Sequence, residues 1–173
     1  LLVKSGKGGF PVGHIIQVKH FIFTGTQATT TSFAPIQFDV TSSSTGYGCD
    51  ITLSSSSNKV LIFGTISLGY EDGAFNSRAT AEYSTNGGST YSNLDVMHTD
   101  LWAFWEHAQG DNSQGYNVYF RSFSELKATG STTNHFRMQV KKNSDSTNSY
   151  VNKAHITPNT TDNTTIQLLE VVG

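Results

Sequence analysis

Short runs of alternating apolar and polar residues follow one another along the chain. Residues 14–23 are a clear example, because Ile16, Val18, His20 and Ile22 fall on one side of an extended backbone. A period of two residues is typical of a β-strand, in which successive side chains point to opposite faces. The same pattern predicts about ten strands, over residues 14–23, 35–41, 49–53, 58–69, 77–84, 101–107, 116–126, 134–141, 150–156 and 164–172.

Two of these segments indicate how the strands are arranged. Residues 134–141 alternate cleanly, with three apolar side chains predicted to face a core. Residues 58–69 include consecutive apolar residues from Val60 to Phe63, a pattern typical of a central strand that is apolar on both faces. No amphipathic helix of three turns is evident. The predicted fold is therefore all-β, an antiparallel β-sandwich that is jelly-roll-like.

The composition supports this fold and favours one domain. Ser, Thr and Asn make up 55 of the 173 residues, and such residues are poor in helix interiors, while 36% hydrophobic residues supply a core. Residues 1–13 contain four Gly and one Pro and are predicted to be a flexible lead-in or the end of a preceding segment. Residues 14–173 are predicted to be a single β-sandwich domain. Because the chain starts at Leu1, we expect a fragment, a processed product or the ordered part of a longer protein.

The charge and cysteine content exclude several classes of function. Only 14% of the residues are charged and the formal net charge is −2, so no basic field is present to attract nucleic acid or anionic lipid. The sequence contains no run of 18 apolar residues, so no membrane-spanning helix is predicted. Cys49 is the single cysteine, which excludes an internal disulfide framework and a cysteine-based zinc site.

Residues 84–91, Ser-Thr-Asn-Gly-Gly-Ser-Thr-Tyr, predict a hairpin turn, because Asn and Gly readily adopt a positive φ. The segment resembles the Asp-box hairpin of sialidases and other glycan-handling proteins, with Asn86 in place of the usual Asp and Tyr91 in place of the usual Trp. In that family the motif is a folding device and is not catalytic. The resemblance therefore implies a structural role for Ser84, Asn86, Gly88 and Tyr91.

The densest aromatic stretch lies in residues 101–107. Trp102 or Trp105 could be a stacking platform for a sugar ring, since an indole offers a large apolar area with a polar edge. The alternative is that these aromatic residues fill the core or a subunit interface. Further candidates for ligand contact, with the same alternative, are Tyr91, Tyr116, Tyr119 and Arg121.

Metal binding and catalysis are disfavoured by the spacing of the ionisable residues. None of the six histidines forms a recognisable metal-ligand motif, although His14 and His20 share a strand and could meet copies of themselves around a threefold axis. No nucleophile elbow, P-loop or dinucleotide motif is present. The residues that could supply acid and base groups for hydrolysis are Asp95, Asp100 and Glu106 with His98 or His107. We expect no metal, no cofactor and no enzymatic activity.

The order of several segments resembles a loosely defined group of tailed-phage virion proteins. These segments are Gly-His-Ile-Ile-Gln-Val at residues 13–18, Ser-Ser-Ser-Ser-Asn-Lys-Val-Leu-Ile at residues 54–62 and Thr-Thr-Ile-Gln-Leu-Leu-Glu-Val at residues 164–171. The group comprises tail-fibre or receptor-binding head domains, and the resemblance extends over residues 13–172. Its motifs are short and lie within single strands.

The resemblance implies a homotrimeric β-sandwich on the virion that contacts a host-surface glycan or protein and other virion proteins, without catalytic residues. In a homotrimer one apolar sheet face is shared at the axis, and weak contacts gain from multivalency. One alternative is a capsid decoration or fibre-joining protein whose exposed aromatic residues serve assembly. A second alternative is a carbohydrate-binding module or a carbohydrate-active enzyme.

Overall fold

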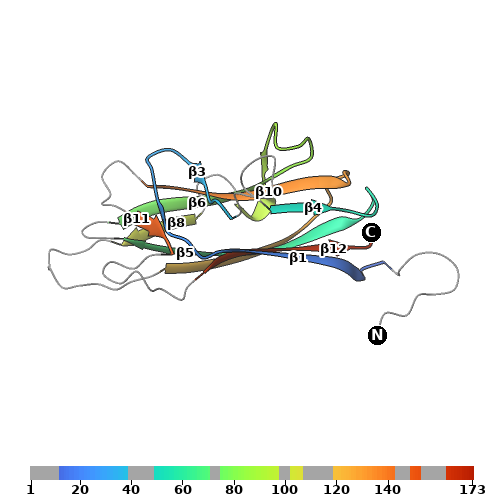
Figure 1. The fold of residues 1–173 in the computed structure, drawn as a ribbon, viewed down its shortest axis with the longest axis horizontal. Coiled ribbons are helices and arrows are strands. Elements are labelled where there is room, and N and C mark those ends of the chain that lie inside the picture. Colours follow the sequence, from blue (N-terminus) through green and yellow to red (C-terminus); the bar gives the residue numbers. More distant parts are fainter. Residues whose placement is uncertain are drawn as a thin grey trace, which may run out of the picture.

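The computed structural model describes residues 12–38, 49–70, 75–97, 102–106, 119–142, 149–152 and 163–173, and these residues form β-strands and one short 3₁₀ helix. No α-helix occurs among them (Figure 1). The elements are β1 (Ile15–Phe23), β2 (Gln27–Ala28), β3 (Ala34–Pro35), β4 (Cys49–Thr52), β5 (Lys59–Tyr70), β6 (Phe75–Ser84), β7 (Ser92–Asn93), η1 (Asp95–Met97), β8 (Trp102–Glu106), β9 (Tyr119–Lys127), β10 (Thr133–Lys142), β11 (Ser149–Val151) and β12 (Thr164–Val171).

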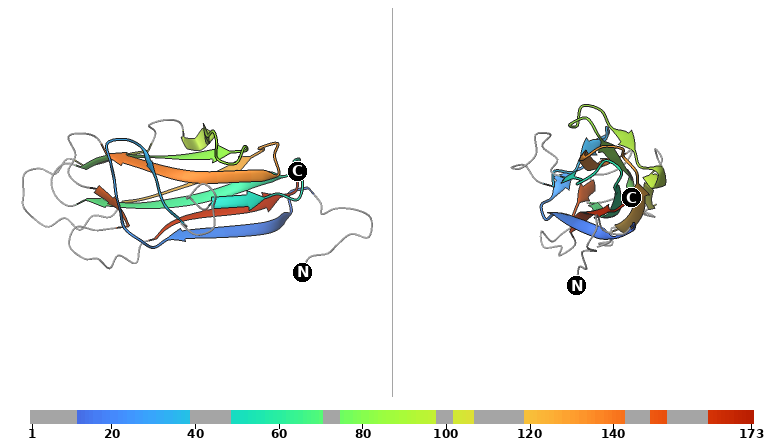
Figure 2. Two further views of the ribbon diagram at one scale, coloured as in Figure 1. Left: turned by 45° about the horizontal axis from the view of Figure 1, so that its top comes forward. Right: turned by 90° about the vertical axis from the view of Figure 1, so that its right-hand side faces the viewer.

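The strands form two antiparallel sheets. In the first sheet β5 is central: β9 pairs with one of its edges, β12 and then β11 pair with the other, β1 lies outside β12, and β2 lies outside β11. In the second sheet the central strands β10 and β6 pair with each other. β3 and β4 pair with the edge of β10 that faces away from β6, and β7 and β8 pair with the edge of β6 that faces away from β10. The two sheets lie one above the other along the same long direction (Figures 1 and 2). This arrangement confirms the predicted antiparallel β-sandwich.

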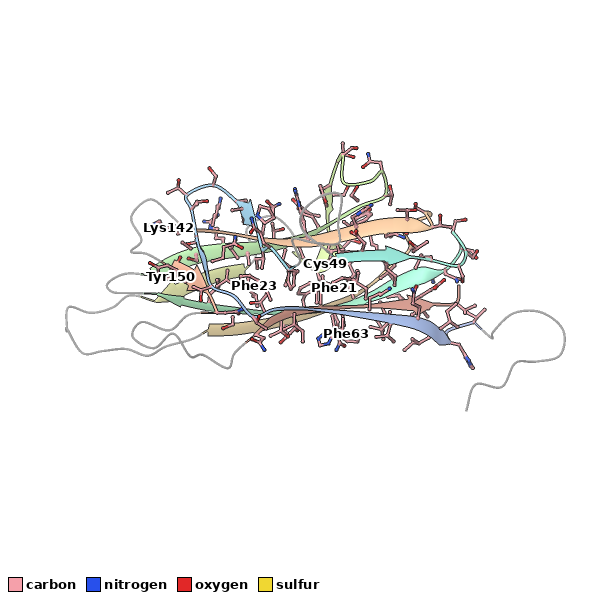
Figure 3. The ribbon with its side chains drawn as sticks, in the orientation of Figure 1. Phe21, Phe23, Cys49, Phe63, Lys142 and Tyr150 are labelled. Atoms are coloured by element: carbon pink, nitrogen blue, oxygen red, sulfur yellow. The ribbon has the colours of Figure 1, made fainter. Side chains whose placement is uncertain are left out.

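The core lies between the sheets and is built from alternate residues of the central strands. On β10 the predicted inward residues Phe136, Met138 and Val140 are all buried. Phe21 and Phe23 of β1 pack against the same core from the first sheet and lie between the two sheets in Figure 3. Apolar burial of this kind is the main source of stability in a chain of which only 14% of the residues are charged.

Glycine occurs where β5 meets an aromatic residue of the neighbouring strand. Gly64 pairs with Phe123 of β9, and a Cβ atom built on Gly64 would lie 2.0 Å from the Phe123 ring. The ring therefore occupies the space that a side chain at position 64 would need.

A buried carboxylate secures the point where the chain passes from the second sheet to the first. Glu170 of β12 accepts hydrogen bonds on Oε1 from the Ser54 backbone N–H at 2.6 Å, from Ser54 Oγ at 2.7 Å and from Asn58 Nδ2 at 2.7 Å. Burial acts to raise the pKa of Glu170, but the hydrogen bonds from Asn58 and Ser54 outweigh burial, so the pKa lies below its usual value. The polar connection between β4 and β5 is thereby tied to the last strand of the chain.

Most of the predicted strands have observed counterparts, and the differences are local. β2 lies between the strands predicted over residues 14–23 and 35–41, and β7 lies between those predicted over residues 77–84 and 101–107; neither was predicted. In the described part of the strand predicted over residues 35–41, Pro35 belongs to β3 and the Ile36 N–H donates a hydrogen bond to the Met138 carbonyl of β10 at 2.8 Å. Ile36 and Phe38 are buried. The structure does not describe residues 1–11, 39–48 and 153–162, where the lead-in and parts of two predicted strands lie.

The interpretation of β5 as apolar on two covered faces was half right. Val60 and Ile62 are fully buried, but the alternate residues Leu61 and Phe63 face away from the second sheet, and Phe63 is 42% exposed. Figure 3 shows Phe63 on the side of the first sheet that points away from the core. β5 is central within its sheet, yet only one face of that sheet is covered by the other.

Candidate binding surface

The β6–β7 hairpin is stabilised by side-chain hydrogen bonds around its turn. Ser84 Oγ accepts hydrogen bonds from the backbone N–H groups of Asn86 at 3.3 Å and Gly88 at 3.0 Å, and donates to Asn86 Oδ1 at 2.8 Å. Asn86 Oδ1 accepts from the Thr90 N–H at 3.0 Å, and Asn86 Nδ2 donates to Thr90 Oγ1 at 2.8 Å. Gly87 and Gly88 have φ values of 72° and 79°, which glycine adopts without strain. The turn is therefore held by its own side chains.

Tyr91, at the end of this hairpin, lies against a charged side chain of β10. The Arg137 guanidinium carbon is 3.7 Å from the centre of the Tyr91 ring. Glu82 holds the guanidinium in place by accepting from Arg137 Nε at 2.6 Å, and it also accepts from Gln139 Nε2 at 2.7 Å. A cation over an aromatic face and a charge-assisted hydrogen bond both favour this arrangement. These four residues anchor the hairpin to the outer face of the second sheet, and Arg137 covers one face of the Tyr91 ring.

The tip of the hairpin presents uncharged polar groups to solvent. Thr85, Asn86, Ser89 and Thr90 are exposed and carry only hydroxyl and amide groups. The hairpin projects from the second sheet (Figures 1 and 2). A projecting loop with fixed geometry and uncharged hydrogen-bonding groups can meet a polar ligand with little loss of conformational entropy on binding.

The two tryptophans that were candidates for stacking on a sugar ring lie on β8, which pairs with β6 of the hairpin. On β8, Trp102 pairs with the core residue Ala79, and Trp105 pairs with Asn76. Trp102 and Trp105 are thus three residues apart on the strand that pairs with β6.

The remaining predicted ligand residues lie elsewhere. Tyr119 and Arg121 are on β9 of the first sheet, where they pair with Leu68 and Ile66. Tyr116 lies outside the described residues. The structure therefore does not bring the five described candidates together into one site: Tyr91 precedes β7 of the second sheet, the two tryptophans lie on β8 of the same sheet, and Tyr119 and Arg121 lie on β9 of the first sheet.

The ionisable groups named for hydrolysis do not assemble in the described part of the chain. Asp95 binds Lys127 Nζ at 2.7 Å, and this hydrogen bond, opposed by burial, raises the pKa of Lys127. Glu106 of β8 pairs with Phe75 of β6, and Asp100, His98 and His107 lie outside the described residues.

A different carboxylate–histidine pair, which the sequence did not suggest, links β4 to β10. His135 Nδ1 lies 2.7 Å from Asp50 Oδ1, and His135 Nε2 is buried without a hydrogen-bond partner. Ser84 of β6 is the residue directly opposite His135, and its Oγ donates its hydrogen bond to Asn86 Oδ1 rather than to His135. The pair therefore serves to join two strands, and it lacks a hydroxyl held for attack.

Neither a metal-ligand cluster nor a membrane-spanning helix occurs among the residues that the structure describes. These residues contain no group of three or more His, Cys, Asp or Glu side chains placed to hold a metal ion. His14 and His20 are both exposed. The same residues form no helix that is long and apolar enough to cross a bilayer.

Comparison of the sequence with protein-family models and with curated proteins found no match. The functional reading of this chain therefore depends on its own surfaces. One is the polar hairpin of the second sheet, anchored by Tyr91 and Arg137. The other is the outer face of the first sheet, where apolar side chains such as Phe63 are exposed.

Sequence reasoning missed the role of Arg137 and Glu82 at the hairpin. The outward-facing charge at position 137 was visible in the alternation of residues 134–141, but its partner on β6 depends on the register of two distant strands. The consecutive apolar residues Val60 to Phe63 of β5 could have indicated the exposed apolar face of the first sheet, but they were interpreted as a strand covered on both faces.

Proposed function

We propose that the protein is a non-enzymatic adhesion module of a virion, comparable to the head of a tail fibre, which binds a host-surface glycan or protein. The observation that carries the proposal is the polar hairpin, whose tip is rigid, uncharged and projecting. Hydroxyl and amide groups are the hydrogen-bonding partners that a neutral glycan or a polar protein surface offers in return. The low charge of the chain suits recognition through hydrogen bonds rather than through an electrostatic field.

The roles of the described ionisable side chains support a binding module over an enzyme. Glu170 holds the β4–β5 connection, Arg137 anchors the hairpin, and His135 joins β10 to β4. Each of these groups has a structural partner that accounts for its position. A catalytic group needs instead to be aimed at a site that substrate can enter.

We further propose that the module acts as a homotrimer displayed on the virion surface. Several identical hairpins on one particle would bind together, and the effective concentration of the later contacts raises the overall affinity by orders of magnitude. Weak recognition by one polar loop is then sufficient for stable attachment.

Competition for adsorption tests this proposal. Purified chain is added to host cells before the parent particle, and the fraction of particles adsorbed is measured. We expect the wild-type chain to reduce adsorption and the Thr85→Lys variant, which adds a long charged side chain at the hairpin tip, to lose this effect. Thr132→Lys is the matched control, because Thr132 is also exposed but lies in the β9–β10 connection. Equal inhibition by the two variants would contradict the assignment to the hairpin.

Treatment of the cells identifies the type of receptor. Loss of binding after periodate oxidation indicates a glycan, and loss after protease treatment indicates a protein. Trp102→Ala and Trp105→Ala test the aromatic strand next to the hairpin in the same assay, and unchanged adsorption with both would exclude β8 from the site. Release of reducing sugar from host polysaccharide by the purified chain would contradict the non-enzymatic assignment.

A structural role in the virion, as a capsid decoration or fibre-joining protein, is the second candidate, and the exposed apolar face of the first sheet favours it. Such a face can pack against another virion protein. Localisation of the chain by electron cryomicroscopy distinguishes the two: density at the tip of a fibre supports adhesion, and density on the capsid shell supports decoration.

A further inference from the structure

A pocket that is open to solvent lies where residues of β1 in the first sheet meet the end of β4 in the second. Its lining residues, which define what we call the seam pocket, are Ile16, Gln17, Thr52, Leu53, Ser54 and Glu170. Its volume is about 530 Å³, within the roughly 300–1,000 Å³ of ligand pockets. Because Glu170 is close to the last residue of the chain, the seam pocket lies at the end of the sandwich that holds the C-terminus (Figure 1).

A β-bulge in β1 brings two consecutive side chains to the seam pocket. Ile15 pairs with Val171 and Gln17 pairs with Glu170, so Ile16 is the extra residue of the bulge. On a regular strand Ile16 and Gln17 would point to opposite faces, but here both line the pocket. Bulges are frequent at sheet edges and beside functional sites, where they redirect a side chain. β1 is an edge strand among the described strands of its sheet, so the bulge fits this use.

The wall of the seam pocket holds a hydrogen-bond acceptor without a partner. Gln17 Oε1 is buried and accepts no hydrogen bond. A buried acceptor of this kind costs free energy, which a ligand that donates a hydrogen bond to it recovers. The ligand must therefore carry a donor.

The carboxylate of Glu170 restricts the charge of such a ligand. Its Oε1 already accepts from Ser54 and Asn58, and the residue is only 2% exposed, so it leaves little uncompensated charge to attract a cation. Its negative charge also disfavours an anion, and none of the six lining residues is Lys or Arg. An uncharged ligand fits these groups best.

We propose that the seam pocket binds one ring of a neutral sugar. A sugar ring carries hydroxyl groups that donate to an acceptor such as Gln17 Oε1, and it carries C–H groups that pack on aliphatic side chains, here Ile16 and Leu53. The seam pocket shares no residue with the hairpin at residues 84–91, so this assignment does not depend on adhesion through the hairpin.

Titration of the isotope-labelled chain with single sugars, followed by two-dimensional amide NMR spectra, tests the seam pocket. The probes are glucose, galactose, mannose and N-acetylglucosamine, and methylammonium is the cationic comparison. We expect at least one of the sugars to shift the side-chain amide signal of Gln17 and the backbone signals of residues 52–54. The dissociation constant should be on the order of millimolar, because one ring makes few contacts.

Gln17→Leu removes the acceptor at nearly constant size. The variant should bind the sugar about 3- to 10-fold more weakly, as expected for the loss of one hydrogen bond. Its free energy of unfolding should stay equal or rise, because a buried acceptor without a partner is removed, whereas a purely structural role of Gln17 would lower it. Gln167→Leu is the matched control: Gln167 lies on β12 opposite Phe63, outside the seam pocket, and its replacement should leave sugar binding unchanged.

The remaining outcomes overturn the assignment. Wild-type spectra in which none of the four sugars shifts the seam-pocket signals would contradict it, as would sugar binding that Gln17→Leu and Gln167→Leu leave equally strong. Shifts with methylammonium but with no sugar would assign the pocket to a cationic ligand instead. The adhesion proposal fails separately: a chain that binds sugar in the seam pocket but does not compete for adsorption contradicts adhesion alone, and a chain that competes while no sugar shifts these signals contradicts the seam pocket alone.

Discussion

The buried carboxylate of Glu170 should make a large contribution to stability that depends on its charge. Glu170→Gln keeps an oxygen that can accept from Ser54 and Asn58 but removes the negative charge. Hydrogen bonds to a charged group contribute about 1 kcal/mol more than neutral ones, so three of them set an upper limit of about 3 kcal/mol. Burial of the Glu170 charge itself costs free energy, and Glu170→Gln removes this cost, so the net loss of stability is smaller than the upper limit. We expect the free energy of unfolding at pH 7 to fall by about 1–3 kcal/mol.

The pH dependence gives this prediction a second, independent readout. Because the pKa of Glu170 is lowered in the folded protein, the unfolded chain binds its proton first as the pH falls. The stabilisation is therefore fully present above the pKa of the unfolded carboxyl, near 4.3, and is lost as the pH falls through the lower folded value. The difference between wild type and Glu170→Gln should shrink accordingly below pH 4.

Urea unfolding followed by circular dichroism, at one fixed protein concentration, measures both effects. Glu170→Ala is the informative companion variant, because it leaves the donors of Ser54 and Asn58 without their acceptor and should cost about 3–5 kcal/mol. A Glu170→Gln variant within 0.5 kcal/mol of wild type at pH 7 would refute the reasoning. A difference that stays constant from pH 7 to pH 3 would refute the assignment to the charge.

Three further substitutions test the fold and the hairpin by the same unfolding measurement. Gly64→Ala should destabilise the protein by about 1–3 kcal/mol, because the new methyl group displaces the Phe123 ring, and Phe123→Leu in the same chain should recover part of the loss. Asn86→Ala should cost about 1–2 kcal/mol through loss of the turn hydrogen bonds, whereas Asn86→Asp, which keeps the acceptor oxygen, should stay within about 0.5 kcal/mol. Tyr91→Ala should cost about 1–2 kcal/mol by removing the ring that Arg137 contacts, whereas Tyr91→Phe keeps a ring and should cost less. A Tyr91→Ala variant that loses less stability than Tyr91→Phe would contradict the stacking role.

The architecture of the sandwich was predictable because its determinants are local. Alternation on β10 identified Phe136, Met138 and Val140 as core residues, and the structure buries all three. β2 and β7 were not predicted, since each has two residues and is defined by its partner strand rather than by a pattern.

The surfaces were less predictable, because they depend on register and on what covers each sheet. The contact between Tyr91 and Arg137 requires β6 to pair with both β7 and β10 in one particular register, which no local pattern specifies. The exposure of Phe63 could not be inferred either, because an apolar residue on the second face of a strand is equally consistent with a covering sheet or a neighbouring subunit.

Adsorption of the parent particle to its host, in the presence of increasing amounts of the purified chain, is the most direct test of the adhesion function. The account predicts that the wild-type chain occupies the receptors and that adsorption falls with its concentration to a plateau, while the Thr85→Lys variant has little effect. Adsorption that stays unchanged at saturating concentrations of folded wild-type chain would contradict the central claim.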